Sequence, residues 1–410
     1  MSAVPVRVAC PFCGLVCDDL IVDGERVDGR GCAKAAANFS RRVTTSEHRI
    51  AGRAASLDDA VAAAAALLRG AGQPLVTGLG ADLSGMRALL ALAERLGAVV
   101  DRWRSAPQFA NFAVLQRAGM LAATFAEIAN RTDLALIVGS DPARSYPRFF
   151  ERLLRNATPL YRKAAPSVVY LGPEVAAPTD PAVGERIAVE GDRLPDALRA
   201  LAAAIEGRRV AADPDVKLAA LVALARRLES ASYGTIVWDA AELPALARED
   251  IASLILRVLR TLTHKTRCVG LPLGGNDNAQ GVAQAMLWQT GWPGRLSFAT
   301  GTPIHDPWLY DAERLLREGE VDVLLWVQAF GVELPPATRV PTIALLSADV
   351  APPAPAAVEI RIGVPGLDHR GWVMRSDTVV ALPLAETRSA PLPSVATVAT
   401  AIHRHVEAQP

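Results

Sequence analysis

The chain has 410 residues, and its 43 Lys and Arg residues balance 43 Asp and Glu residues, which leaves no net charge. A neutral surface provides no net field to hold nucleic acid or an anionic membrane. A hydrophobic content of 51% with 21% charged residues predicts a globular protein with a large core. The N-terminus lacks the pattern of a signal peptide, and no apolar run approaches the ~20 residues that cross a bilayer. We therefore expect a cytoplasmic protein, and the zero net charge favours a chain that works within a complex.

Four of the five cysteines lie in one short N-terminal segment, with the spacing C-x2-C-x3-C and then fourteen residues before the fourth. They are Cys10, Cys13, Cys17 and Cys32. The segment 20–29 has apolar runs around Asp23-Gly24, a turn dipeptide, and so predicts a β-hairpin that returns the fourth cysteine beside the first three.

Four thiolates on a tight loop are the ligand set of a [4Fe–4S] cluster or of a structural zinc ion. The x3 gap favours iron–sulfur over the paired x2 spacing that is usual for zinc. Disulfides are the alternative, although nothing in the sequence indicates an oxidising compartment. Cys268 lies inside an apolar run and is expected to be an ordinary buried residue.

Helices and strands alternate after this segment. Ser56 precedes a helix with Asp58 and Asp59 in its first turn, where carboxylates favour a helix N-terminus. A short apolar strand, a helix at SGMRALLALAERLG (84–97) and the strand AVVDRW follow it. This alternation predicts an α/β fold with doubly wound, mostly parallel sheets.

The same alternation continues to the end of the chain. We expect strands at Leu134–Val138 and within SVVYLGP, YGTIVWD, TRCVGLPLGG, DVLLWVQ, TIALLSAD and VEIRIG, helices at Leu194–Ile205, Val216–Ser230 and after Glu242, a last strand region around Val373–Leu384 that completes the sheet, and a terminal helix.

Common catalytic and nucleotide-binding motifs are absent from the sequence. Glycines end several strands, but none forms GxGxxG or GxxxxGK[ST]. No two of the six histidines have HExxH spacing, and no GxSxG elbow occurs. Outside the cysteine segment, the sequence therefore indicates no catalytic residue.

The segment CPFCGLVCDDL, followed by the hairpin and by SDPARSYPRFFER, resembles the B-type subunit of formylmethanofuran dehydrogenase, a molybdopterin-dependent or tungstopterin-dependent oxidoreductase. The resemblance implies that Cys10, Cys13, Cys17 and Cys32 correspond to the ligands of a [4Fe–4S] cluster beside a metal held by two pterin dinucleotides. It also implies a cysteine-rich lobe (1–50), a first α/β lobe (51–132 with 276–410) and a second, inserted α/β lobe (133–275).

Two departures from this family concern its redox centre. The family has a cysteine or selenocysteine that binds the metal, and its place falls on or near Pro107, where neither Ala106 nor Pro107 offers a soft donor. We expect Trp103, Pro107 and Phe109 to fill the space of the cofactor. A family Asp-Pro-Arg after a strand reads Gly172-Pro173-Glu174 here, which places negative charge where a pyrophosphate needs an arginine.

A chain that resembles this subunit but lacks its redox centre is similar to the counterpart of the subunit in the formyltransferase/hydrolase complex of methylotrophic bacteria. It implies a non-catalytic structural subunit, beside A-, C- and D-type subunits, of an enzyme that moves a formyl group between tetrahydromethanopterin and a methanofuran-like carrier and releases formate. The cysteine site then holds [4Fe–4S], zinc or nothing, and no tungsten or molybdenum pterin is expected. The alternatives are an active tungsten or molybdenum dehydrogenase subunit and a free-standing iron–sulfur electron carrier.

Overall fold

The computed structural model describes residues 5–155, 158–209, 216–352 and 354–408. It divides into two compact units, the first made of residues 1–105 and 276–410 and the second of residues 106–275. The sequence placed the boundary at 132/133, so residues 106–132 belong to the second unit rather than the first.

Unit 1 is built around a nine-stranded sheet with the order β14-β13-β7-β6-β15-β16-β17-β4-β5. Its elements are β1 (Val6–Val8), β2 (Leu20–Asp23), β3 (Arg26–Val27), α1 (Ala33–Phe39), β4 (His48–Ile50), β5 (Arg53–Ala55), α2 (Leu57–Arg69), β6 (Pro74–Gly80), α3 (Leu83–Leu96), β7 (Val99–Val100), α10 (Ala279–Thr290), β13 (Leu296–Ser297), β14 (Ile304–His305), α11 (Ala312–Glu318), β15 (Val323–Gln328), β16 (Thr342–Ser347), β17 (Val358–Ile362), β18 (Gly371–Met374), β19 (Ala381–Leu384) and α12 (Val395–Glu407).

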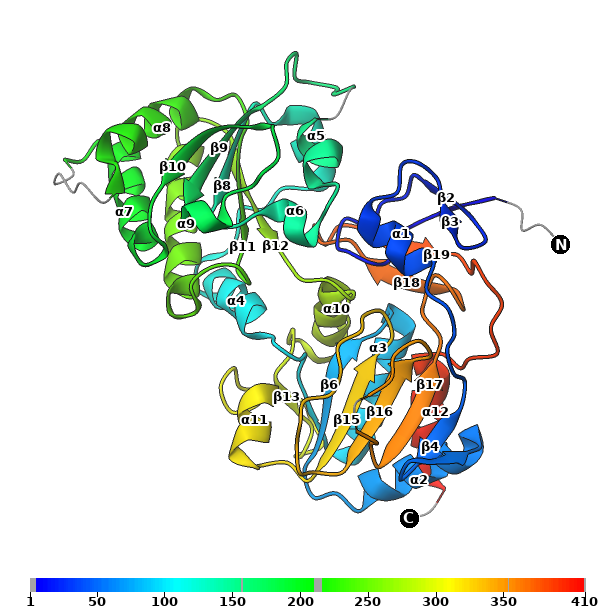
Figure 1. The fold of residues 1–410 in the computed structure, drawn as a ribbon. Coiled ribbons are helices and arrows are strands. Elements are labelled where there is room, and N and C mark those ends of the chain that lie inside the picture. Colours follow the sequence, from blue (N-terminus) through cyan, green and yellow to red (C-terminus); the bar gives the residue numbers. More distant parts are fainter. Residues whose placement is uncertain (1–4, 156–157, 210–215, 353, 409–410) are drawn as a thin grey trace. The chain divides into compact units, whose positions relative to one another are not determined.

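The central five strands of this sheet run parallel, and β6 pairs directly with β15 although they lie far apart in the sequence. Figure 1 shows these two strands side by side. Both faces of the sheet are buried, which explains why its strands read as continuous apolar runs. Helices α2, α3, α10 and α12 pack on one face, and α11 packs on the other.

Local signals start and stop the helices of this unit as the sequence predicts. The Ser56 hydroxyl accepts a hydrogen bond from the backbone N–H of Asp59 at 3.1 Å and begins α2. Asp82 caps α3 in the same way, and Gly97 ends that helix in the left-handed conformation at φ +65°.

Unit 2 contains a five-stranded sheet, all parallel, in the order β10-β9-β8-β11-β12. Its elements are α4 (Ala106–Ala118), α5 (Phe125–Arg131), β8 (Leu134–Val138), α6 (Pro142–Ser145), a π-helical turn η1 (Phe150–Leu154), β9 (Ser167–Gly172), η2 (Glu174–Ala176), β10 (Val183–Ala188), η3 (Gly191–Arg193), α7 (Leu194–Ile205), α8 (Leu218–Ser230), β11 (Gly234–Asp239), η5 (Ala245–Ala247), α9 (Arg248–Thr263) and β12 (Cys268–Leu273). Helices α7, α8 and α9 bury one face of this sheet.

An α/β fold with parallel sheets is therefore confirmed, with corrections in detail. The region around Val373–Leu384 does not complete the large sheet; β18 and β19 pair only with each other as a separate two-stranded sheet. The chain after Asp141 forms the short helix α6 and then the π-helical turn η1. The part of the expected helix Val216–Ser230 that forms is Leu218–Ser230.

None of the helices that the structure describes is both long enough and apolar enough to cross a membrane.

Candidate functional site

The cysteine segment folds as a tight loop followed by the predicted hairpin. The backbone N–H of Cys10 donates to the carbonyl of Cys17 at 2.8 Å, which closes the loop that carries the first three cysteines. Strands β2 and β3 then pair antiparallel around Gly24, whose φ of +59° suits the turn. The hairpin prediction is confirmed.

The thiols of this segment are largely buried and none forms a disulfide. Cys10, Cys13 and Cys17 are 4%, 7% and 5% exposed, while the Cys32 sulfur caps α1 by accepting a hydrogen bond from the backbone N–H of Ala35 at 3.4 Å. Burial, followed by the charge of Cys13, raises the pKa of the Cys10 thiol well above its ordinary value. Cys17 and Cys32 contribute weakly in the same direction to the pKa of the Cys10 thiol.

The donor set suits a soft metal, because thiolates are the ligands of zinc and of iron–sulfur clusters. Within the described residues, however, no three or more His, Cys, Asp or Glu side chains are grouped so that they could hold a metal ion. The four cysteines are thus near one another without forming a ready-made site. Their assignment as metal ligands stays a prediction.

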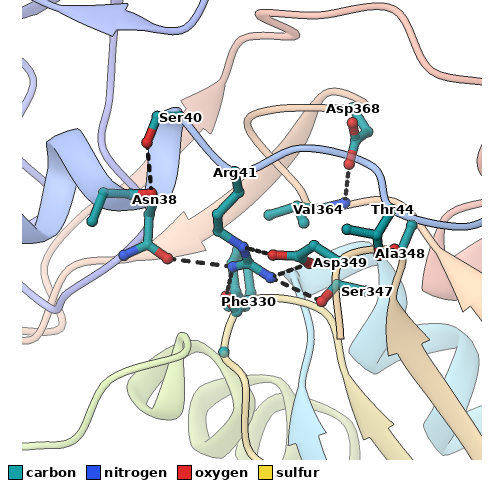
Figure 2. Close-up of polar contacts among 12 residues, drawn as sticks. Asn38, Ser40, Arg41, Thr44, Phe330, Ser347, Ala348, Asp349, Val364 and Asp368 are labelled. Carbon is teal, nitrogen blue, oxygen red and sulfur yellow. Dashed lines mark hydrogen bonds and ion pairs between the residues drawn. The ribbon is translucent and has the colours of Figure 1, made fainter. Parts of the chain in front are cut away.

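Arg41 attaches the helix that follows Cys32 to the large sheet (Figure 2). Its guanidinium donates to both carboxylate oxygens of Asp349, to the Ser347 hydroxyl at 2.8 Å and to the carbonyl of Phe330. The side chains of Arg41 and Asp349 are only 9% and 13% exposed. Burial alone would raise the pKa of Asp349, but the hydrogen bonds and charge of Arg41 outweigh it and hold that pKa below its ordinary value.

Further contacts fix the cysteine loop to the same unit. The backbone N–H of Ser376 donates to the carbonyl of Gly14 at 2.9 Å, next to the β18–β19 hairpin. Gly366 lies so close to Pro11 that a Cβ at Gly366 would come within 3.1 Å of the proline ring. Side-chain and backbone contacts therefore both hold the cysteine segment against unit 1.

The segment expected to replace the redox-metal ligand lies at the junction of the two units in the sequence. Pro107 falls in the first turn of α4, where proline is well tolerated. Within unit 1, Trp103 packs edge-on against Trp326 with ring centroids 5.7 Å apart. Within unit 2, Phe109 packs against Phe112 at 5.5 Å. Filling of the former cofactor space by these residues stays a prediction.

A buried polar network that the sequence did not reveal lies beside Trp103. The carboxylate of Asp101 accepts hydrogen bonds from the Ser105 hydroxyl at 3.0 Å and the Ala312 backbone N–H at 3.1 Å. The guanidinium of Arg295 lies 3.8 Å from this carboxylate and 2.6 Å from that of Asp311. Burial, opposed by the charge of Arg295, raises the pKa of Asp101 to about 7.

In unit 2, the carboxyl edge of the parallel sheet is where a doubly wound fold usually binds its ligand. Four acidic residues, Asp141, Glu174, Asp239 and Glu242, lie at or just after the ends of β8, β9 and β11, and the charges of three of them act on the phenol of Tyr170. Arg144 lies 3.9 Å from Asp141 and 3.6 Å from Glu242, and Arg186 lies 3.4 Å from Glu174.

Hydrogen bonds lock this acidic edge. A carboxylate oxygen of Glu242 accepts a hydrogen bond from the backbone N–H of Asp141 at 3.0 Å. The Tyr170 hydroxyl donates to the carbonyl of Pro173 at 2.7 Å. Burial raises the pKa values of Glu242 and Asp239, against the opposing charges of Arg144 and Arg248 respectively.

Similarity to known proteins agrees with this geometry. No protein-family model matches the chain. The chain is 33% identical over 324 residues to the B-type subunit of the formyltransferase/hydrolase complex Fhc of Methylorubrum extorquens AM1, covering 77% of this chain and 85% of that protein. The chain belongs to the family of B-type subunits of formyltransferase/hydrolase complexes.

More distant relatives are dehydrogenase subunits. The B-type subunit of the tungsten-containing formylmethanofuran dehydrogenase 2 of Methanocaldococcus jannaschii is 25% identical over 346 residues, covering 79% of each protein. Among solved structures, a chain of the crystal structure of the FhcABCD complex from Methylorubrum extorquens with methylofuran superposes with a TM-score of 0.75 and 30% identity, covering 88% of this chain and 99% of that one.

Proposed function

We propose that the chain is a non-catalytic structural subunit of a formyltransferase/hydrolase complex, with A-, C- and D-type partner subunits in the cytoplasm. The complex moves a formyl group between tetrahydromethanopterin and a methanofuran-like carrier and hydrolyses the formyl carrier. In that hydrolysis, water adds to the formyl carbon, the carbon–nitrogen bond to the carrier breaks, and formate and the free amine leave. The carbon keeps its oxidation level, so no electron acceptor is needed.

The observation that carries the proposal is the acidic edge of unit 2. Asp141, Glu174, Asp239 and Glu242 lie at the carboxyl edge of the parallel sheet, where doubly wound folds usually bind their ligands. The arginines at this edge are already paired, Arg144 with Asp141 and Glu242 and Arg186 with Glu174. At an effective dielectric constant of 20, each unit charge 4 Å from a phosphate costs about 4 kcal/mol. The loss of a soft donor at Pro107 points in the same direction.

The chain's own residues then serve to hold shape and partners. Arg41 and Asp349 keep the cysteine segment attached to unit 1, and the parallel sheets give both units rigid frames. A metal bound by Cys10, Cys13, Cys17 and Cys32 would reinforce that attachment and would carry no electrons for the formyl reactions.

The complex purified without oxygen tests this proposal. We expect no tungsten or molybdenum, no pterin dinucleotide released by acid, and no reduction of viologen dyes by the formyl carrier, together with full release of formate. Stoichiometric pterin with tungsten or molybdenum would contradict the proposal and favour an active dehydrogenase subunit. Failure of the chain to co-purify with the A-, C- and D-type subunits would contradict the proposal that it is a subunit of such a complex.

A further inference from the structure

Two exposed tryptophans of unit 1 flank a surface pocket of about 430 Å³. Trp288 is on α10 and is 60% exposed, and Trp372 is on β18 and is 48% exposed. Helix α3, which packs against both elements, supplies Ser84 and Arg87 to the wall of the pocket. All of these residues belong to one compact unit, so the pocket does not depend on how the two units are arranged.

The strand that carries Trp372 turns this position outward, but it does not require a tryptophan there. In β18 the neighbours Gly371 and Val373 are buried, so the alternation of the strand turns Trp372 outward, opposite Pro383 of β19. An indole left in water forfeits the burial of up to ~150–250 Å² of apolar surface. Leu287, beside Trp288, is also 40% exposed, which extends the apolar surface along α10. Adjacent large apolar side chains of this kind mark an interaction site.

Arg87 adds a positive charge to this surface, which favours a partner with a negative charge. Arg87 is exposed on α3, and the part of the chain that the structure describes gives it no ion pair or hydrogen bond. Other surface arginines near carboxylates are paired, as Arg42 is with Glu25 at 2.9 Å. A guanidinium that lines the same pocket as two indoles favours a partner that brings a carboxylate together with an apolar group. Tryptophan and arginine are also the residues that most often dominate the binding energy of protein interfaces.

We propose that Trp288, Trp372 and Arg87 form the anchor site for another subunit of the complex, which inserts an apolar side chain into the pocket and pairs a neighbouring aspartate or glutamate with Arg87. This inference rests on the proposed function and specifies one surface through which the chain meets its partners. A partner subunit is favoured because the relative from Methylorubrum extorquens is itself a subunit of the FhcABCD complex. The remaining pocket wall, Leu83, Ala285 and Gln289, offers apolar area and one amide to such a segment.

Hydroxyl-radical footprinting of the intact purified complex tests the anchor site directly. Trp308, which is 65% exposed on the same unit, is the internal reference, and added N-acetyltryptophanamide gives the rate for full exposure. On a free surface the three tryptophans would oxidise at similar rates. We expect Trp288 and Trp372 to oxidise at least tenfold more slowly than Trp308. Equal rates in a complex that contains this chain would overturn the anchor site and leave the proposed function standing.

Variants add an energetic readout. Trp372→Ala and Arg87→Glu should each raise the dissociation constant of the chain from the co-expressed complex at least tenfold, measured by mass photometry on dilution. Arg87→Lys, which keeps the charge, should stay closer to the wild type, and Trp308→Ala should have no comparable effect. Circular dichroism of each variant separates weaker assembly from misfolding. Wild-type stability of the complex with Trp372→Ala and Arg87→Glu, or protection of the tryptophans only in a self-dimer of this chain, would overturn the proposal.

Discussion

Replacing Arg41 by alanine should loosen the attachment of the cysteine segment to unit 1. The substitution leaves the carboxylate of Asp349 largely buried, with its side chain 13% exposed, and without its charged partner. Removing one partner of a buried ion pair costs roughly 3–5 kcal/mol. Water that enters the loosened segment recovers part of this cost. We therefore expect the free energy of local opening to fall by about 3 kcal/mol. This value corresponds to roughly a hundredfold increase in the population of the open state.

Hydrogen–deuterium exchange of the intact complex measures this opening. The backbone N–H groups of Ser40 and Thr44 report it, because they donate to Ala36 at 3.2 Å and to Ala348 at 3.1 Å on either side of Arg41. Their exchange should accelerate about a hundredfold in Arg41→Ala, and less in Arg41→Lys, which keeps the charge but not the fork of donors.

The neighbouring arginine is a matched control. Arg42 pairs with Glu25, but the two side chains are 77% and 48% exposed, and such surface pairs contribute at most about 1 kcal/mol. Arg42→Ala should therefore leave the exchange of Ser40 and Thr44 nearly unchanged. Equal acceleration in Arg41→Ala and Arg42→Ala would refute the argument that burial makes the Arg41 pair decisive.

The pH dependence of the Arg41 effect follows from Asp349. Its pKa is lowered in the folded protein, so the pair stabilises fully above the unfolded-state pKa of about 4 and the contribution is lost as the pH falls through the folded pKa. The difference between wild type and Arg41→Ala should therefore narrow below pH ~4.

Three other predictions concern Asp101, Cys13 and the region around Pro107. Because burial raises the pKa of Asp101 to about 7, the folded chain holds a proton that the unfolded chain releases near pH 4, and stability should fall as the pH rises between these values. Asp101→Asn should flatten that part of the pH profile of the urea midpoint; parallel profiles would argue against it. Cys13→Ala should lower stability or assembly without changing turnover per intact complex, and a fully assembled but inactive variant would indicate a catalytic role. The region around Pro107 should bind no pterin dinucleotide, which acid release and fluorescence of the pterin would check.

Local signals made much of the fold predictable from the sequence. The strand at Leu134–Val138 and the helix at Leu194–Ile205 form within the expected bounds, because apolar periodicity and flanking breakers act over a few residues. The helix α4 was not predicted, although proline in a first helical turn is compatible with a helix. The wrong placement of β18 and β19 has another cause, since sequence pattern alone does not select the partner of a strand.

The candidate site was predictable only in part, because the sequence does not show which distant residues the fold brings together. The spacing of the cysteines and the charge of Glu174 are visible in the sequence. The pairing of Arg41 with Asp349, 308 residues further on, is not, because only the folded sheet brings them together. The exposure of Trp288 and Trp372 could not be inferred either, since tryptophan in an apolar context usually predicts core.

The split composition of unit 1 has a consequence for synthesis on the ribosome. Strand β6 cannot pair with β15 before most of the chain has been synthesised. Helices α2 and α3 cannot pack against α12 until nearly the whole chain has been made. At 5–20 residues per second, the first part of unit 1 waits for roughly 15–60 s while unit 2, an unbroken stretch, completes its own fold. During that interval the four N-terminal thiols and the apolar face of α3 lack their final neighbours. The yield of folded chain should therefore depend on molecular chaperones and reducing conditions more than the stability of the folded protein suggests.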